Sequence, residues 1–426
     1  MTVKRECLKP EILAPAGDKV SLQAALDAGC DAVYLGIRGM NMRAGAKNFT
    51  LASLPGICSR CHARGVRVYL ALNTVVFERE RKKIAQIIAG AGSAGIDAVI
   101  CSDYAVIQAA HLQGVPVHIS TQMSVANAQG VLFFYQHFQV RRFVLARECS
   151  LNDIVRIRRE LTLRLGAQAA EIEIEVFVHG AMCVSVSGRC FMSLLQYGKS
   201  ANRGECLQPC RREYRAAAVD EDVSFVLGNN YVMSPRDLCA LPILERLIRA
   251  GVASFKIEGR NRSPEYVATA TAAYRRAVDY YCANHKKNGF HKSFAALKED
   301  LVQELARVYH RGFSTGFYLG KPMDAWSGTS GSVATTRKEY AGVVQKYFRK
   351  AGVAEVRVES NPFAVGDEIM FQGPTSGTFS QEVVSIEIEH RRVSKASKGM
   401  VVAVKTTGRV RTNDRVYLVK GLRRKK

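Results

Sequence analysis

The feature that most limits the fold of this chain is a short apolar segment that recurs eight times, usually followed by a polar turn and a helical stretch. The segments lie at residues 11–16, 32–37, 66–73, 98–102, 115–120, 142–147, 173–180 and 253–259. Most are continuous runs rich in Val and Ile, as parallel strands buried on both faces are. Eight such units match a (β/α)8 TIM-like barrel in number and length, and a doubly wound open sheet is the alternative.

The stretches between these strands carry helix signals. Asp18 and Ser150 stand where N-cap residues belong, and glycines often close the helices. The interval 181–252, between the last two strands, is long, and we interpret it as an insertion in the barrel. From Trp326 onward the helical periodicity fades and short β-like runs follow one another. We therefore predict a TIM-like barrel domain over 1–325 and a small basic β-barrel domain over 326–426.

The charge of the chain indicates a polyanionic partner. It has 61 Lys and Arg against 38 Asp and Glu, a net charge of +23. So large an excess repels itself unless a polyanion is near, and nucleic acid is the commonest such partner. Residues 326–426 hold 19 Lys and Arg against 9 Asp and Glu, which favours this domain as a nucleic-acid handle. The alternative is a capping domain whose basic face binds nothing.

The compartment follows from what the sequence does not contain. No segment approaches about 18 uninterrupted apolar residues, and the first residues lack the apolar region of a secretory signal. We therefore expect a cytoplasmic protein with no membrane span. Thiols stay reduced in the cytoplasm, so clustered cysteines there indicate metal binding or catalysis before disulfides.

Four cysteines are crowded into the predicted insertion in the spacing C-x6-C-x15-C-x3-C, namely Cys183, Cys190, Cys206 and Cys210. Four thiolates can close a tetrahedral zinc site or hold an iron–sulfur cluster, and structural zinc usually shows two short C-x2-4-C pairs. Four unrelated buried cysteines are the alternative. Cys239 is a possible alternate fourth ligand. Cys58 and Cys61 also form a pair, but no second pair follows, and we expect them on a helix.

Polar residues follow the ends of several predicted strands. In a barrel of this kind the carboxyl ends of the strands converge on one mouth, where active sites lie. An acidic residue inside a buried strand, such as Glu175, needs a partner or a task. The candidates at or near the strand ends are Asn73, Gln122, Arg147, His179, Lys256, Glu258 and Arg260.

Several of these segments resemble the collagenase-like peptidase family of unknown mechanism. The similarity is carried by EILAPAGDKVSLQAALDAGCDAVYLG, EVFVHGAMCVSVSGRC, MSPRDLC and SFKIEGRNRSPEYV, and it covers residues 10–320. The last domain resembles an elongation-factor-type barrel. Some members hydroxylate RNA, at the tRNA wobble uridine or at a cytidine of large-subunit rRNA. The resemblance implies an oxygen-independent hydroxylation that depends on a 4Fe–4S cluster, with prephenate as a co-substrate.

The resemblance implies a role for the four clustered cysteines, and we infer the roles of the other candidates from their chemistry. The four clustered cysteines match the family arrangement and would be the cluster ligands. We expect Arg43, Arg147 and Arg260 to bind the carboxylates of a prephenate-like acid, and salt bridges at the barrel rim are the alternative. We expect His179 or Glu258 to move protons at the substrate base. The remaining candidates would assist, Glu175 in catalysis and Asn73, Gln122 and Lys256 in substrate binding.

These expectations lead to one function with three alternatives. The leading hypothesis is a tRNA-modifying enzyme that converts the wobble uridine of the anticodon loop into 5-hydroxyuridine. The alternatives are a collagenase-like peptidase, an enzyme that hydroxylates rRNA or another substrate, and a non-catalytic RNA-binding partner. The sequence shows no nucleophile elbow and no H-E-x-x-H motif, which disfavours the peptidase.

Overall fold

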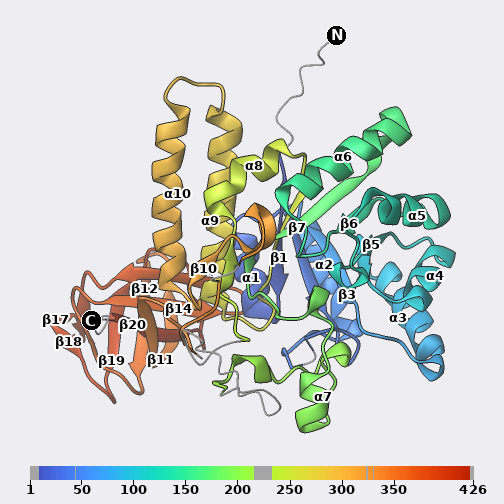
Figure 1. Ribbon diagram of the computed structural model, residues 1–426. Coiled ribbons are helices and arrows are strands. Elements are labelled where there is room, and N and C mark those ends of the chain that lie inside the picture. The colour runs from blue at the N-terminus through green and yellow to red at the C-terminus, as the bar shows by residue number, and fades with distance from the viewer. Residues whose placement is uncertain (1–8, 44, 215–232, 323–324, 330, 423–426) are drawn as a thin grey trace, which may run out of the picture.

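The computed structural model describes residues 9–43, 45–214, 233–322, 325–329 and 331–422. Its largest sheet contains eight parallel strands that close into a barrel (Figure 1). Closure is made by the last of them, which pairs with both the first and the seventh. The strands are β1 (Glu11–Ala16), β2 (Ala32–Gly36), β3 (Arg67–Leu72), β4 (Ala98–Cys101), β5 (Val117–Ile119), β6 (Arg142–Val144), β7 (Glu173–Gly180) and β9 (Ser254–Ile257). The predicted TIM-like barrel is confirmed, and the open-sheet alternative is wrong.

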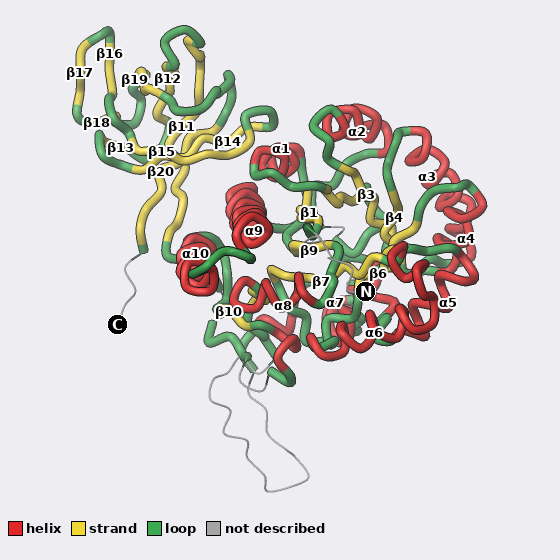
Figure 2. Tube along the Cα trace, turned by 90° about the horizontal axis from the view of Figure 1, so that it is seen from above, coloured by secondary structure: helices red, strands yellow, loops and turns green. Residues whose placement is uncertain are grey.

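Helices surround the barrel strands on the outside, as the view from above shows (Figure 2). Asp18 caps the first helix by accepting a hydrogen bond from the backbone N–H of Ser21 at 2.8 Å. Ser150 and Asp153 form a capping box at the start of the sixth. The helices are α1 (Lys19–Asp27), α2 (Leu54–His62), α3 (Arg81–Ser93), α4 (Tyr104–Leu112), α5 (Ala128–Phe138), α6 (Leu151–Leu165), α8 (Leu244–Arg249), α9 (Pro264–Asn284) and α10 (Phe290–Arg307).

The insertion after β7 adds structure beyond the repeat. It carries α7 (Met192–Tyr197), which stands out from the barrel at the bottom of Figure 1. It then returns through β8 (Asp237–Cys239), which pairs antiparallel with the end of β7, and β10 (Phe313–Ser314) pairs with β8. Neither short strand is predicted by the sequence, because each has too few residues to show a pattern.

The C-terminal part is an all-β domain, as predicted. Its main sheet is antiparallel, in the order β15-β14-β20-β11-β12-β19-β16-β17, and it packs over a separate apolar core. A two-stranded sheet joins β13 (Phe363–Ala364) and β18 (Lys395–Ala396). The strands of the main sheet are β11 (Thr336–Phe348), β12 (Val353–Val358), β14 (Glu368–Gly373), β15 (Gly377–Glu382), β16 (Ile386–Ile388), β17 (Arg391–Val393), β19 (Val401–Lys405) and β20 (Arg415–Gly421).

Polar contacts join this domain to the barrel. Lys338 on β11 forms an ion pair with Glu265 at the start of α9, with 2.8 Å between the charged atoms. Gln372 on β14 donates a hydrogen bond to the same carboxylate at 2.8 Å. The domain therefore docks on the helical outside of the barrel and leaves the barrel mouth open. No helix among the described residues is long and apolar enough to cross a membrane.

Candidate functional site

A cavity lies at the carboxyl ends of the barrel strands, where the cysteine-bearing insertion covers them. It brings together residues from seven of the eight barrel strands or the turns that follow them, and from the insertion, although they are far apart in sequence. The predicted residues that line it are Arg43, Asn73, Gln122, Arg147, Lys256, Glu258 and Arg260, together with Cys183, Cys190, Cys206 and Cys210. Glu175, His179 and Cys239 do not line it.

Glu258 is the negative centre of the cavity. Its carboxylate lies 3.2 Å from Nε of Arg43 and 3.9 Å from Nη2 of Arg147, and the hydroxyl of Tyr34 donates to it at 3.4 Å. Burial alone would raise the pKa of Glu258, but Arg43, Arg147 and Arg260 together lower it to about 2. The carboxylate therefore stays ionised at neutral pH, which makes it a fixed counter-charge and a poor general base.

A close backbone approach brings Glu258 next to the insertion. Gly180 ends β7 with a φ of +110°, and a Cβ at this position would meet the carbonyl oxygen of Glu258 at 2.4 Å. Only glycine fits both the conformation and the space. The chain can thus turn from β7 into the segment that carries Cys183, directly beside the carboxylate.

The arginines of the cavity are only partly satisfied by the protein. Arg147 donates to the carbonyl of Ala181 at 2.8 Å, and its guanidinium stacks 4.0 Å above the ring of Phe177. Arg260 is buried and donates from Nη1 to Asn41 at 3.0 Å, but its Nε has no partner among the described residues. Burial lowers the pKa of Arg260 because a charged guanidinium loses its hydration there. These cations favour an anionic occupant.

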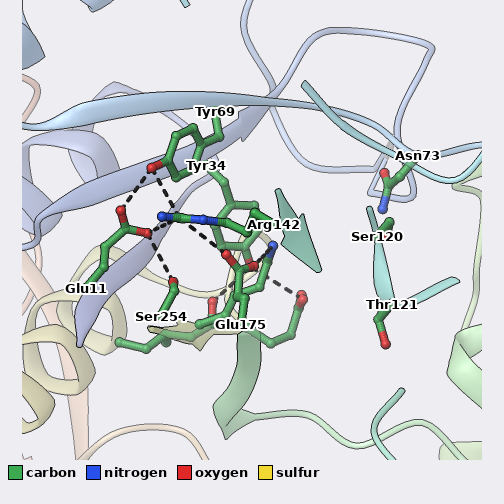
Figure 3. Close-up of polar contacts among 12 residues, drawn as sticks. Glu11, Tyr34, Tyr69, Asn73, Ser120, Thr121, Arg142, Glu175 and Ser254 are labelled. Carbon is green, nitrogen blue, oxygen red and sulfur yellow. Dashed lines mark hydrogen bonds and ion pairs between the residues drawn. The ribbon is translucent and has the colours of Figure 1, made fainter. Parts of the chain in front are cut away.

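Neutral amides and hydroxyls form another side of the cavity. Asn73 donates to the side-chain oxygen of Gln122 at 2.9 Å, and the hydroxyl of Ser120 donates to the same oxygen at 2.5 Å. Figure 3 places Asn73, Ser120 and Thr121 apart from the charged residues of the barrel interior. This side can offer hydrogen bonds to a polar ligand without adding charge.

A buried ion network lies inside the barrel (Figure 3). We call it the floor of the cavity because one of its members, Lys256, lines the cavity. Lys256 donates to Glu175 at 2.7 Å, and Arg142 approaches the same carboxylate at 3.7 Å. Arg142 also pairs with Glu11 at 2.5 Å, which accepts from Tyr69 at 2.9 Å. Glu175 therefore has the partner that its burial requires, and its geometry favours positioning Lys256 over contact with a substrate.

His179 lies on the outside of β7 and not in the cavity. Its ring packs against Tyr266, Tyr274 and Phe313, with centroids 5.6, 5.7 and 5.8 Å away. Burial lowers the pKa of His179 to about 3, with help from the nearby His310. The imidazole is neutral at neutral pH and faces an aromatic layer, so the expectation that it moves protons at a substrate does not fit its position.

The four clustered cysteines share the cavity. The backbone N–H of Ser185 donates to the sulfur of Cys183 at 3.5 Å, and that of Met192 donates to Cys190 at 3.3 Å. The pKa of the Cys210 thiol is raised, first by burial and then by the charges of its three neighbouring thiols, although Arg211 opposes this. The sulfur of Cys210 therefore lies within electrostatic range of the other three sulfurs.

Two cysteines are candidates for a fourth ligand beside Cys183, Cys190 and Cys206. In the described part of the chain, no three ligand-type side chains form a ready-made site for a metal ion. Cys239 is buried elsewhere, and burial raises the pKa of its thiol to about 11. Of the two, Cys210 lines the cavity together with the other three cysteines, and Cys239 does not.

Arg211 lines the cavity and is not among the sequence candidates. It is buried next to Cys210 and donates to Ser234 at 3.0 Å, to the carbonyl of Pro235 at 2.7 Å and to the carbonyl of Met182. Because Met182 precedes Cys183, this side chain ties the first and last cysteines of the cluster together. The only sign in the sequence that Arg211 belongs to the cavity is its position directly after Cys210.

Three relatives and one family match place these features in context. Residues 17–328 match peptidase family U32. A collagenase of Porphyromonas gingivalis strain W83 is 41% identical over 411 residues, which cover 96% of this chain and 97% of that protein. The tRNA hydroxylation protein P1 of Bacillus subtilis is 30% identical over 384 residues, covering 89% and 87%. A 23S rRNA 5-hydroxycytidine synthase of Escherichia coli is 32% identical over 319 residues, covering 75% and 46%.

Proposed function

The chain belongs to peptidase family U32, and we propose that within this family it is an enzyme that hydroxylates a base of RNA. The observation that carries the proposal is the cavity in which four cysteines meet four arginines at the mouth of a barrel. Relatives that match along 89% and 75% of the chain bear the names of a tRNA and an rRNA hydroxylation protein. The net charge of +23 suits a polyanionic substrate.

The finer proposal is the conversion of the tRNA wobble uridine into 5-hydroxyuridine. The uridine would leave the anticodon loop and enter the barrel mouth, which costs little because loop bases are easily unstacked. The amide side of the cavity, made by Asn73, Gln122 and Ser120, would read the edge of the base. This part of the proposal rests on the B. subtilis relative, whose name refers to tRNA.

The four cysteines would hold a 4Fe–4S cluster through their thiolates. When bound, such a cluster supplies one-electron transfer. Replacing C–H by C–OH with oxygen from water releases two electrons and two protons, so the electrons would have to leave through the cluster to an external electron acceptor. Backbone N–H groups already point at the sulfurs of Cys183 and Cys190, as they do at cluster ligands. Arg211 would keep Cys183 and Cys210 in register, and its charge would favour the deprotonated form of Cys210.

The cavity cations would bind a dicarboxylic co-substrate such as prephenate. Arg147 and Arg260 lack a full set of protein partners, and guanidinium groups bind carboxylates in a two-point fork. Glu258 would hold Arg43 and Arg147 in place by its fixed negative charge, which offsets the repulsion between the two guanidinium groups. Since neither Glu258 nor His179 is placed and tuned to accept a proton, we assign proton transfer to neither.

Anaerobic purification followed by iron and sulfide analysis tests the cluster. We expect about four iron atoms per chain in the parent protein, and loss of iron when Cys206, which is exposed at the mouth, is replaced by serine. Mass spectrometry of tRNA from a strain without the gene tests the reaction. Wobble uridine that stays fully hydroxylated in a strain lacking paralogues would refute the tRNA reaction.

Peptidase activity is the second candidate, because the P. gingivalis relative at 41% identity is named a collagenase. The cavity itself gives it little support. Among the described residues that line the cavity there is no histidine, so the cysteines and Ser120 lack the usual general base. Gelatin cleavage by metal-free protein, abolished by a single substitution of Ser120 or of one cysteine, would favour the peptidase over the hydroxylase.

A further inference from the structure

The surface around the mouth of the cavity exposes an unusual number of large apolar side chains. They lie on α7 and on the two turns that flank it in the insertion. Phe191 is 64% exposed and Leu195 is 83% exposed, and Tyr197 is 36% exposed. Met192 and Ser193 of the same helix line the cavity, so the exposed side chains border the entrance directly. Apolar side chains gathered at one place on a surface mark an interaction site.

The loop after β3 continues this surface on the other side of the mouth. The backbone N–H of Val75 donates to the carbonyl of Asn202 at 3.4 Å, and Arg203 pairs with Glu80 through both nitrogens of its fork. The two segments are thereby joined into one rim. Phe77, in the middle of the loop, keeps 50% of its surface exposed.

Arginines accompany the exposed rings of this rim. The guanidinium of Arg203 lies 5.1 Å from the ring centre of Phe77, and that of Arg79 lies 5.6 Å from it. Arg212 lies 5.3 Å from the ring centre of Tyr197. Neither Arg79 nor Arg212 forms an ion pair with any described residue, so both retain donors for an anionic partner.

We propose that this rim binds the nucleotides that flank the modified base, as a single strand whose bases stack on Phe77 and Phe191 and whose phosphates contact Arg79 and Arg212. The inference rests on the proposed function, because a base can enter the cavity only if its neighbours cross the rim. Alternating aromatic rings and guanidinium groups are the surface that unpaired nucleotides bind. A partner protein could contact the apolar side chains, but it would not account for Arg79 and Arg212, which form no ion pair with a described residue.

The test compares binding of a fluorescein-labelled RNA stem-loop, with a uridine-containing seven-nucleotide loop, to the parent protein and two double variants. Phe77→Ala/Phe191→Ala removes both rings, and we expect binding to weaken roughly tenfold for each ring lost. Arg79→Ala/Arg212→Ala should lower the slope of log affinity against log salt by about 0.7 for each cation. A control variant, Leu163→Ala/Arg159→Ala on α6, removes an exposed apolar group and a cation far from the mouth and should change neither quantity.

The outcomes separate this inference from the function on which it rests. If the parent protein binds the RNA and both rim variants bind equally well with an unchanged salt slope, the rim is not the RNA surface, but the proposed function stands. If the parent protein does not bind the RNA at all, both fail. If Phe77→Ala/Phe191→Ala changes the molecular mass measured by light scattering but not RNA binding, the rim is a contact between protein subunits and the inference is wrong.

Discussion

Replacing Glu258 by glutamine should destabilise the protein through the charges that this carboxylate balances. Its pKa lies at about 2, against 4.5 for an unperturbed glutamate, because Arg43, Arg147 and Arg260 outweigh the cost of burial. This difference corresponds to about 3 kcal/mol in favour of the ionised group. The substitution keeps the shape of the side chain and removes only the charge, so we expect the free energy of unfolding at pH 7 to fall by about 3 kcal/mol.

The pH dependence gives this prediction a second signature. A folded-state pKa below the unfolded value stabilises the protein above pH 4.5, and this stabilisation is lost as the pH falls through about 2. The difference between the parent protein and Glu258→Gln should therefore be complete at pH 7 and shrink steadily below pH 4.5. Urea denaturation followed by circular dichroism measures it at each pH.

A matched control shows whether the effect belongs to the cavity. Glu160→Gln makes the same change on α6, where Glu160 and Arg164 form an ion pair with roughly half of each side chain exposed. We expect it to cost about 0–1 kcal/mol, as exposed ion pairs do. If Glu258→Gln costs no more than this control, or if its cost does not depend on pH, the arginines do not hold the carboxylate as the geometry indicates.

Three further predictions concern the residues around the cavity. Cys210→Ser should lose iron on anaerobic purification while Cys239→Ser keeps it, and equal iron in the two variants would contradict the ligand assignment. Arg211→Lys should leave at least one of the three partners of the guanidinium unpaired, which we expect to lower stability by about 1–3 kcal/mol and to make the cluster thiols faster to alkylate in the iron-free protein. His179→Phe should reduce the amount by which the free energy of unfolding falls between pH 6.5 and pH 3. Over that range the unfolded chain takes up a proton that the folded imidazole refuses, and this costs the parent protein about 1.4 kcal/mol per pH unit.

The barrel could be predicted from the sequence because each of its strands carries its own signal. Strands buried on both faces are mostly apolar, and all eight predicted segments overlap the barrel strands. β8 and β10 carry no such signal. Each is held by pairing with a neighbour that the insertion brings to it, and this depends on contacts between residues distant in the chain.

The site could be predicted as a set of positions but not as a set of orientations. Strand ends converge in a barrel, so Arg147, Lys256 and Glu258 meet as expected. His179 also ends a strand, and alternation alone would place it on the same side as Glu175 and Phe177. The pairing of β7 with β9 shifts register between Phe177 and His179, and the ring of His179 points at the aromatic residues of α9. The apolar run before His179 gives no sign of this irregularity.

The charges of the cavity indicate which of its parts are complete before a ligand binds. In the floor of the cavity, the positive charges of Lys256 and Arg142 are balanced by the negative charges of Glu175 and Glu11. The floor therefore needs no ligand to balance its charge. In the upper part of the cavity, by contrast, the single charge of Glu258 is set against those of Arg43, Arg147 and Arg260. A buried cation without a counter-charge is costly unless an anion binds. An occupant with negative charge, whether a thiolate-bound cluster or a dicarboxylic acid, would lower that cost, so the upper cavity should gain stability on binding while the floor stays unchanged.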